Sequence, residues 1–289
     1  MDIIIFLKVI SIYCVYCIFT YVYRQDVSAE IRLLLLIFTT EYQLKMYGWA
    51  KGIFFMIIHN LKITIENSKL KDNFLIPKGE VITNVDITKV DRKSHYYVFD
   101  NIVKSSTIDC ILSLRKQYDG NIIALNFANA NISGGGYIFG GDAQEESLCR
   151  ASMLYYSIKG CNRYYNYNRF KSIPFIYSDY MIYSHNIPII RNSNDILLND
   201  IEKCSFVTCP AVNRTFAKLF VSNSKIKSIM KRRIEKILSL MVNKNPQVIV
   251  LGAWGCGAFG NQKDMVFNLF ENAINELVPD SIKVIFAVI

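Results

Sequence analysis

Residues 121–150 read NIIALNFANANISGGGYIFGGDAQEESLCR, and no other segment of the chain is as informative. An apolar run from Asn121 to Phe127 leads into an asparagine-rich turn, a glycine-rich segment and a helical stretch that begins at Gln144. A strand, a loop and a helix in that order are typical of an α/β unit whose loop lies at the carboxyl end of the strand. We therefore expect this segment to supply both a central strand and a binding loop.

The sequence around this segment alternates apolar runs with helical patterns. The clearest pattern lies around Lys225–Val242, where apolar residues recur at helical spacing. Continuous apolar strands that alternate with amphipathic helices predict an α/β sheet covered on both faces. The other predicted elements are strands at Tyr177–Tyr183, Phe206–Val212, Gln247–Leu251 and Lys283–Ile289, and helices from Gln144 to about Ile158 and at Met265–Leu277.

The N-terminal segment 3–23 is almost wholly apolar, interrupted only by Lys8, and is long enough to cross a bilayer as a helix. Arg24 follows it directly and no small-residue cleavage site does, which disfavours a cleaved signal peptide. Two interpretations stay open with equal weight, an uncleaved membrane anchor and a buried helix. Because the next basic residues all follow the segment, an anchor would leave the rest of the chain in the cytoplasm.

The chain divides by composition into three parts. Residues 1–30 form the hydrophobic segment, and residues 31–95 combine two short apolar stretches with a polar, charge-rich linker. Residues 96–289 hold the alternating strands and helices, and we expect them to form the main α/β domain.

Charge and potential metal ligands narrow the function classes. The net charge of +9 favours polyanionic partners without choosing among them. The eight cysteines are scattered through apolar runs, as is typical of reduced thiols in an intracellular protein, and the single CxxC, Cys14–Cys17, has no second ligand pair. None of His59, His95 and His185 lies in a ligand pattern. We therefore expect no metal centre.

The triple glycine Gly134, Gly135 and Gly136 follows the first strand directly, and Gly140 and Gly141 extend it. Without Cβ atoms such a backbone can adopt positive φ and lie directly against a sugar or diphosphate. A plain flexible loop is the alternative, but it does not explain three glycines placed between an apolar strand and a helix. In the turn before them, Asn129 and Asn131 offer amides that suit ribose hydroxyls, although asparagine is also common in ordinary turns.

Gln144, Glu145 and Glu146 begin the helix that follows the glycines. Acidic residues are common there because they favour the positive end of the helix dipole, which lowers a carboxyl pKa. A general acid needs a raised pKa, so one of the two carboxyls must be desolvated or repelled by its neighbour. Adjacent helical residues point about 100° apart, so only one of them can face a given reacting bond.

A second glycine cluster, VIVLGAWGCGAFGN at Val248–Asn261, follows another predicted strand. Glycine amides after a strand are the usual place for phosphate in an open α/β sheet. The spacing is a poor match to a dinucleotide fingerprint, and no GxxxxGK[ST] motif for ATP occurs. Trp254 and Phe259 suit adenine or ribose contacts, or else fill the core.

These segments together resemble the catalytic domain of microbial-type poly(ADP-ribose) glycohydrolases. FANANISGGG followed by QEESLCR resembles the GGG and QEE signature of that family, and three further blocks follow in the same order. The resemblance covers roughly residues 96–289 and leaves out the apolar N-terminal region. The further blocks are YMIYSHNIPIIR at Tyr180–Arg191, VTCPAVNR at Val207–Arg214 and LGAWGCGAFGN at Leu251–Asn261.

The resemblance implies a macro-domain-like three-layer α/β/α fold with a mixed sheet and ADP-ribose in a cleft at the strand ends. It implies hydrolysis of the ribose–ribose O-glycosidic bonds of poly(ADP-ribose), with no metal or cofactor and with ADP-ribose as product. Carried over, Glu146 would protonate the leaving ribose oxygen and then help to activate water, while Glu145 would hold ribose hydroxyls. The residues implied in substrate binding are Asn129, Gly134, Gly135, Gly136, Gln144, Gly255, Cys256, Gly257, Ala258 and Phe259.

Three rival functions follow from the same residues. A non-hydrolytic ADP-ribose reader would keep the loops but has no need of both acids. A hydrolase of single ADP-ribosyl groups on proteins would use the same cleft. A membrane-associated nucleic-acid binder would use the basic helix around Lys225–Lys236, although such a run is more often a solvated face. We expect poly(ADP-ribose) or ADP-ribosylated proteins as partners and no specific nucleic acid.

Overall fold

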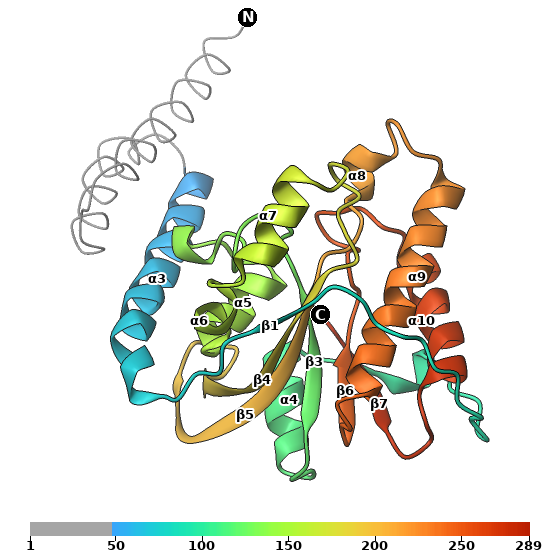
Figure 1. Ribbon diagram of the computed structural model, residues 1–289. Coiled ribbons are helices and arrows are strands. Elements are labelled where there is room, and N and C mark those ends of the chain that lie inside the picture. Colours follow the sequence, from blue (N-terminus) through green and yellow to red (C-terminus); the bar gives the residue numbers. More distant parts are fainter. Residues whose placement is uncertain (1–47) are drawn as a thin grey trace, which may run out of the picture.

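The computed structural model describes residues 48–289, and their centre is a single seven-stranded sheet (Figure 1). The predictions for segment 3–23 and for the Cys14–Cys17 pair lie outside the described residues. The strands follow one another across the sheet in the order β1-β4-β5-β3-β6-β7-β2. They are β1 (Glu80–Ile82), β2 (Ile102–Lys104), β3 (Ile122–Phe127), β4 (Met181–Arg191), β5 (Leu197–Cys209), β6 (Val248–Leu251) and β7 (Lys283–Val288).

The sheet is mixed, as predicted. Strand β3 pairs in parallel with β5 on one side and β6 on the other, and β7 lies parallel to β6 and β2. Strand β4 runs antiparallel to both β5 and β1. The carboxyl ends of β3, β5, β6 and β7 therefore meet at one edge of the sheet, where loops from separate parts of the chain can combine into one site.

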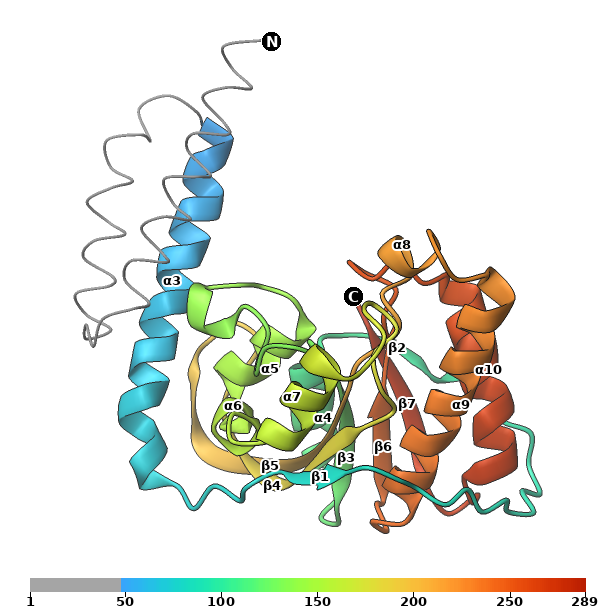
Figure 2. The same ribbon diagram turned by 45° about the horizontal axis from the view of Figure 1, so that its top comes forward.

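Helices cover both faces of the sheet, which confirms the three-layer prediction (Figures 1 and 2). Alternate residues of β3 point to opposite faces, so that Ile123 and Leu125 join one core while Ile122 and Ala124 join the other. The first core packs against α9 (Asn223–Val242) and α10 (Lys263–Leu277). The second packs against α4 (Thr107–Arg115), α5 (Gln144–Ala151), α6 (Leu154–Ile158) and α7 (Asn162–Phe170).

Helix α9 shows why the sequence pattern was readable. Its apolar residues, including Ile226, Met230, Ile237 and Met241, are buried on the sheet. Full burial of each such side chain contributes about 1.5–3 kcal/mol, so the stripe outweighs intrinsic helix propensity. The side chain of Ser222 caps the helix by accepting a hydrogen bond from the amide of Lys225.

The helix predicted from Gln144 to about Ile158 is wrong in its length. Helix α5 ends at Ala151, and α6 starts separately at Leu154. The two residues between them turn toward strand β4, because Ser152 forms an isolated bridge with Ile189 and the amide of Met153 donates to the carbonyl of Pro188 (2.9 Å). Pairing with the sheet thus interrupts a helical pattern that the side chains alone would continue.

Strands β4 and β5 form a hairpin longer than the apolar runs Tyr177–Tyr183 and Phe206–Val212 indicated. The first seven residues of β5, Leu197–Lys203, are exposed or half-buried, whereas the last six are buried. Only the buried part of such a strand is continuously apolar, so the exposed part left no signal.

Helix α3 (Gly48–Leu70) lies along the side of the molecule beside α5, and a short 3-10 turn, η2 (Lys71–Asn73), ends it (Figures 1 and 2). It contains the apolar stretch Ile53–Ile58 of the sequence analysis. Within residues 48–289, no helix has the length and apolar character needed to cross a membrane. Strand β1 also comes from the predicted accessory region 31–95, and it joins the main sheet through β4.

Candidate active site

Three loops meet at the carboxyl ends of β3, β5 and β6. The indole of Trp254, after β6, donates to the carbonyl of Cys209 at the end of β5 (3.1 Å). The side chain of Asn261 donates to the carbonyl of Val212 (2.8 Å), and the amide of Ala128 after β3 donates to that of Cys209 (3.3 Å). Segments far apart in the sequence are therefore tied into one edge of the sheet.

The first glycine loop, residues 128–143, uses its glycines as the sequence predicted. Gly134, Gly135 and Gly140 have φ of 68°, 56° and 77°, values that residues with a Cβ atom rarely adopt. A Cβ on Gly135 would lie 2.5 Å from Oε1 of Glu146 and 3.2 Å from Oε2 of Glu145. The absence of that Cβ allows both carboxylates to approach the backbone of the loop.

Glu146 lies half-buried in the first turn of α5, with its carboxylate against this loop. Its Oε1 accepts a hydrogen bond from the amide of Gly136 (2.7 Å). Helix α5 therefore presents one carboxylate at the glycine backbone where a sugar can approach.

Glu145 points in another direction and is almost fully buried, at 3% exposure. Its Oε1 accepts from the side-chain amide of Asn126 (3.1 Å), and its Oε2 accepts from the amide of Asn129 (2.6 Å). Burial raises the pKa of Glu145 to about 8, and the nearby carboxylate of Glu146 adds to the rise, while the hydrogen bonds from Asn129 and Asn126 oppose it. The desolvated member of the pair is thus Glu145.

Gln144 fixes the start of α5 on strand β3. Its Oε1 accepts from the amide of Phe127 (2.9 Å), and its Nε2 donates to the carbonyl of Leu125 (3.0 Å) and to the hydroxyl of Thr107 (3.2 Å). These bonds take the place of strand pairing on the β6 side of β3, where the pairing of β3 with β6 ends at Ala124. Contact between Gln144 and substrate stays a prediction.

Asn129 shapes the turn after β3. Its side-chain oxygen accepts from the amides of Asn131 (2.9 Å) and Ile132 (3.0 Å), the pattern of an Asx turn. Asn129 therefore forms a turn, and its contact with substrate stays a prediction.

Helix α3 holds the first glycine loop from outside, and the sequence analysis missed this. Asn60 donates from its side chain to the carbonyls of Gly140 (3.0 Å) and Gly141 (3.3 Å), and Thr64 donates to that of Tyr137 (3.3 Å). Asn67 donates to the hydroxyl of Tyr137 (3.3 Å) and the carbonyl of Arg150 (2.8 Å). The spacing of these three polar residues by four and three, which places them on one side of the helix, was the available signal.

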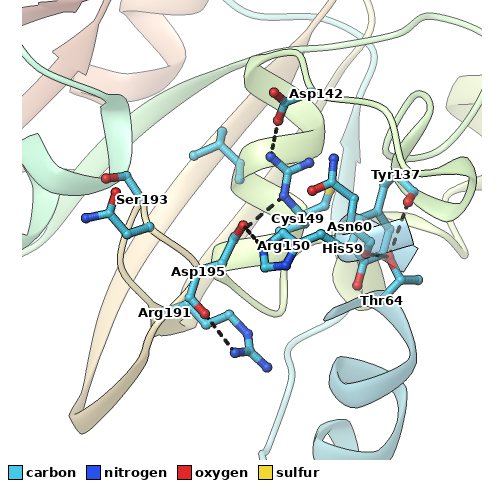
Figure 3. Close-up of polar contacts among 12 residues, drawn as sticks. His59, Asn60, Thr64, Tyr137, Asp142, Cys149, Arg150, Arg191, Ser193 and Asp195 are labelled. Atoms are coloured by element: carbon cyan, nitrogen blue, oxygen red, sulfur yellow. Dashed lines mark hydrogen bonds and ion pairs between the residues drawn. The ribbon is translucent and has the colours of Figure 1, made fainter. Parts of the chain in front are cut away.

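A charged network joins α3, α5 and the first glycine loop to the turn between β4 and β5 (Figure 3). Arg150 of α5 pairs with Asp142 of the loop and lies 3.6 Å from a carboxylate oxygen of Asp195, in the β4–β5 turn. The other oxygen of Asp195 contacts His59 of α3 at 3.1 Å, and Arg191 donates to the backbone carbonyl of Asp195 (3.0 Å). Arg150 is buried, so these anions compensate its charge and keep α5 in one position.

The second glycine loop, residues 252–262, is held at its base. Gly255 has φ of 73°, and Asn261 donates to its carbonyl (3.0 Å). Gly257 and Ala258 at the tip are exposed, and a Cβ on Gly257 would meet nothing within 4 Å. Phe259 is half-buried, and its carbonyl accepts a hydrogen bond from the amide of Thr215 (3.2 Å) in the short helix α8 (Arg214–Ala217). The ring of Phe259 lies 6.2 Å from that of Tyr177.

A cavity of about 320 Å³ opens beside the start of α5. Its walls come from the ends of β3 and β7, from the residue after Gly252 and from the start of α4, so both glycine loops border it. The side chains at its centre include Phe127, Ala143, Gln144 and Ala253. Cys256 keeps its proton at neutral pH, because burial raises the pKa of its thiol to about 11. Among the described residues, no group of three or more His, Cys, Asp or Glu side chains is arranged to hold a metal ion.

Comparison with known proteins agrees with this geometry. The family model of the microbial-type PARG catalytic domain matches residues 44–192, just over half of the chain. The structure of poly(ADP-ribose) glycohydrolase from Thermomonospora curvata bound to the inhibitor ADP-HPD is 29% identical, with a TM-score of 0.61 over 65% of this chain and 72% of that one. The enzyme from Deinococcus radiodurans in complex with ADP-ribose is 32% identical, with a TM-score of 0.60 over 65% and 76%. Comparison with curated proteins gives no match.

Proposed function

The chain belongs to the family of microbial-type poly(ADP-ribose) glycohydrolases, and we propose that it cleaves the ribose–ribose bonds of poly(ADP-ribose) with Glu146 as its acid. The assignment of Glu146 depends on the position of its half-buried carboxylate. It lies against the amide of Gly136, next to three glycines that have no Cβ atoms. A carboxyl there can reach a sugar oxygen that lies on the glycine backbone.

The reaction needs one proton donor and one activated water. Glu146 gives its proton to the departing ribose oxygen, and the resulting carboxylate then takes a proton from the water that attacks the oxocarbenium-like centre. No metal or cofactor enters this scheme.

Glu145 supports the site as a mostly protonated group at neutral pH. Its oxygens fix Asn126 and Asn129, and therefore the turn that leads into the glycine loop. Its raised pKa also supports a second assignment, in which Glu145 is the acid and Glu146 binds ribose hydroxyls. We favour Glu146, because Glu145 is enclosed by its own hydrogen-bond partners.

The rest of the substrate fits the remaining features of the edge. The exposed amides at Gly257 and Ala258 suit the diphosphate, and Phe259 offers a ring for a ribose. The cavity of about 320 Å³ beside Phe127 and Gln144 is partly apolar and suits the adenine.

The test is release of ADP-ribose from purified poly(ADP-ribose) by the wild type, Glu146→Gln, Glu145→Gln and the matched control Glu202→Gln, which alters a half-buried glutamate of β5 away from the glycine loops. Binding of ADP-ribose is measured on each protein. We expect Glu146→Gln to bind ADP-ribose and to lose at least about 100-fold in kcat, as removal of a general acid does. Glu145→Gln should keep more activity than Glu146→Gln.

Two outcomes would contradict this assignment. A Glu145→Gln protein that folds and binds but is the less active of the two would make Glu145 the acid. A wild type that binds ADP-ribose and releases nothing from the polymer would make the chain a reader. Assay on proteins that carry single ADP-ribosyl groups then separates a reader from a hydrolase of those groups.

ADP-ribosylated proteins are the partners that this activity requires. We also keep the proposal of a cytoplasmic protein that associates with membrane through segment 3–23. Fractionation of the full chain beside a shortened chain that begins near residue 30 tests it, and equal distribution of the two would rule out that segment as the anchor.

A further inference from the structure

We propose that the surface formed by α7, α8 and the segments that follow them docks on an anionic lipid membrane. Five large apolar side chains project from this surface, which we call the α7–α8 face: Phe170, Ile173, Phe216, Leu219 and Phe220. Leu219 is 76% exposed and Phe170 is 72% exposed. Single exposed apolar residues are ordinary on proteins, but a group of five on adjoining segments is not.

Contacts between the segments place Phe216 and Phe220 of this face beside the loop that carries Ile173 and follows Phe170. The ring of Phe175, which follows Ile173 in the loop after α7, stacks on Phe216 with 4.9 Å between centroids and lies 6.3 Å from Phe220. The carbonyl of Phe175 also accepts from the amide of Asn213 (2.8 Å), just before α8. Both views show the loop after α7 next to α8 (Figures 1 and 2).

The charge around these side chains is mostly positive. Segments 160–178 and 210–234 contain no aspartate or glutamate, while they hold three and seven lysines and arginines. Some of these cations have internal partners, since Asp179 pairs with Arg232 and Arg233, and Lys231 pairs with Glu235. Within residues 48–289, the seven others make no ion pair, although two of them, Arg169 and Arg214, donate hydrogen bonds to the backbone carbonyls of Asn131 and Gly260. The remaining five are Arg163, Lys171, Lys218, Lys225 and Lys227.

Apolar side chains surrounded by cations match an anionic bilayer at two depths, the charged headgroups and the acyl chains below them. Lysine and arginine bind the headgroups, and the apolar side chains enter the boundary between headgroups and acyl chains. A polyanion in water, such as nucleic acid or the ADP-ribose polymer, would use the cations and could stack on the phenylalanines. It would leave Leu219 and Ile173 in water, and for this reason we favour the membrane.

This docking does not depend on segment 3–23 or on the hydrolytic activity. Helix α8 contacts the second glycine loop through Thr215 and Phe259, so a docked molecule would hold that loop close to the lipid headgroups. The face therefore orients the molecule, whatever residues 1–47 contribute to its attachment.

The test is sedimentation of the full chain with vesicles of phosphatidylcholine alone or with phosphatidylserine. Because segment 3–23 can itself bind membrane, the quantity compared is the part of the partition that depends on phosphatidylserine. We expect phosphatidylserine to strengthen binding of the wild type, and Leu219→Gln/Phe220→Gln to lose at least about tenfold in this part, as removal of two inserted side chains implies. Equal binding of the wild type to both kinds of vesicle would contradict the proposal. Lys218→Glu should lose at least about fivefold. The matched controls are Leu75→Gln, at a side chain 95% exposed just after α3, and Lys116→Glu at the end of α4, and both should bind as the wild type does.

Insertion is measured separately by fluorescence of Leu219→Trp and Leu75→Trp, as difference spectra against the parent chain. We expect a blue shift and quenching by brominated lipid at position 219 only. A wild type that binds no vesicles would overturn the proposal, as would a Trp at position 219 that stays in water. Retained vesicle binding together with weaker binding of poly(ADP-ribose) in Leu219→Gln/Phe220→Gln would assign the face to the polymer instead.

Discussion

The two glycine-rich loops end neighbouring parallel strands, β3 and β6, yet they are held in different ways. The first loop is fixed along its length by side chains from elsewhere, with Asn60 and Thr64 of α3 on one side and Glu146 of α5 on the other. The second is fixed at its base by Asn261 and along one side by bonds from Arg214 and Thr215 of α8 to its carbonyls, while its tip at Gly257 is exposed. The first is thus arranged before substrate arrives, whereas the second has room to adjust to it.

This difference corresponds to the two tasks that we propose for the loops, acid catalysis for the first and binding of the diphosphate for the second. Acid catalysis requires a carboxyl held in one geometry, because small displacements of a catalytic group cost large factors in rate. A diphosphate clamp needs free amides and tolerates a wider range of positions. Changes in the first loop should therefore act mainly on kcat, and changes in the second mainly on KM.

The largest expected effect comes from Gly135→Ala. The new methyl would lie 2.5 Å from Oε1 of Glu146, in a backbone with φ of 56°, so the carboxylate must move. We expect kcat on poly(ADP-ribose) to fall by about 100-fold or more, in line with the loss of a positioned catalytic group. The matched change Gly257→Ala enters open space and should leave kcat within about threefold of the wild type. Equal losses in the two variants would remove the distinction between the loops.

The second effect is a pH dependence of stability that belongs to the first loop. The pKa of Glu145 is raised to about 8 in the folded chain from an ordinary value of 4.5, so the folded state binds the proton more tightly than the unfolded state. Its contribution to stability is complete below pH 4.5 and is lost as the pH rises to about 8. Relative to Glu145→Gln, the wild type should lose on the order of 2 kcal/mol in unfolding free energy between pH 5 and pH 7.

Urea unfolding of both proteins at each pH measures this difference. Glutamine fits because the amide of Asn126 can turn, so that its Oδ1, which has no hydrogen-bond partner among the described residues, accepts from the new side chain. A difference that does not change with pH would show that Glu145 is not the desolvated carboxyl.

The smallest expected effect comes from Asn67→Ala, which removes the bonds from α3 to Tyr137 and Arg150. Stability should fall by about 1–3 kcal/mol, because buried acceptors are left without partners. We expect kcat to fall about threefold to tenfold with little change in KM, a consequence of a loosened catalytic loop. Asn261→Ala in the second loop should instead raise KM. Steady-state kinetics on both variants checks the contrast, and a KM effect in Asn67→Ala alone would reverse it.

Much of the fold was predictable from sequence, because long apolar stripes fix α9, α10 and the buried strands β3 and β6. The elements that were missed or given wrong ends are those fixed by contacts with distant parts of the chain. Strands β1 and β2 have three residues each, too few for any periodicity, and the end of α5 is set by a bridge from Ser152 to β4. Local pattern carries no information about such pairing.

The candidate site shows the same limit. The glycines and the two glutamates were predictable, since their residue types and spacing carry the chemistry. Which carboxyl is desolvated was not, because the burial of Glu145 depends on Asn126 in β3 and on the path of the turn at Asn129. The support from Asn60 and Asn67 was not predictable either, because they lie 80 and 70 residues before Gly140 and Tyr137, which they bind.

Trp254, one of two tryptophans in the chain, is fully buried between the end of β5 and the second glycine loop. Its indole donates to the carbonyl of Cys209, and its ring lies 6.3 Å from that of Phe270. Emission from an indole depends on its hydrogen bond and on nearby dipoles. This indole, next to the amides that we propose for the diphosphate, is therefore a built-in optical reporter, through which occupancy of the second loop can be followed in real time without a label.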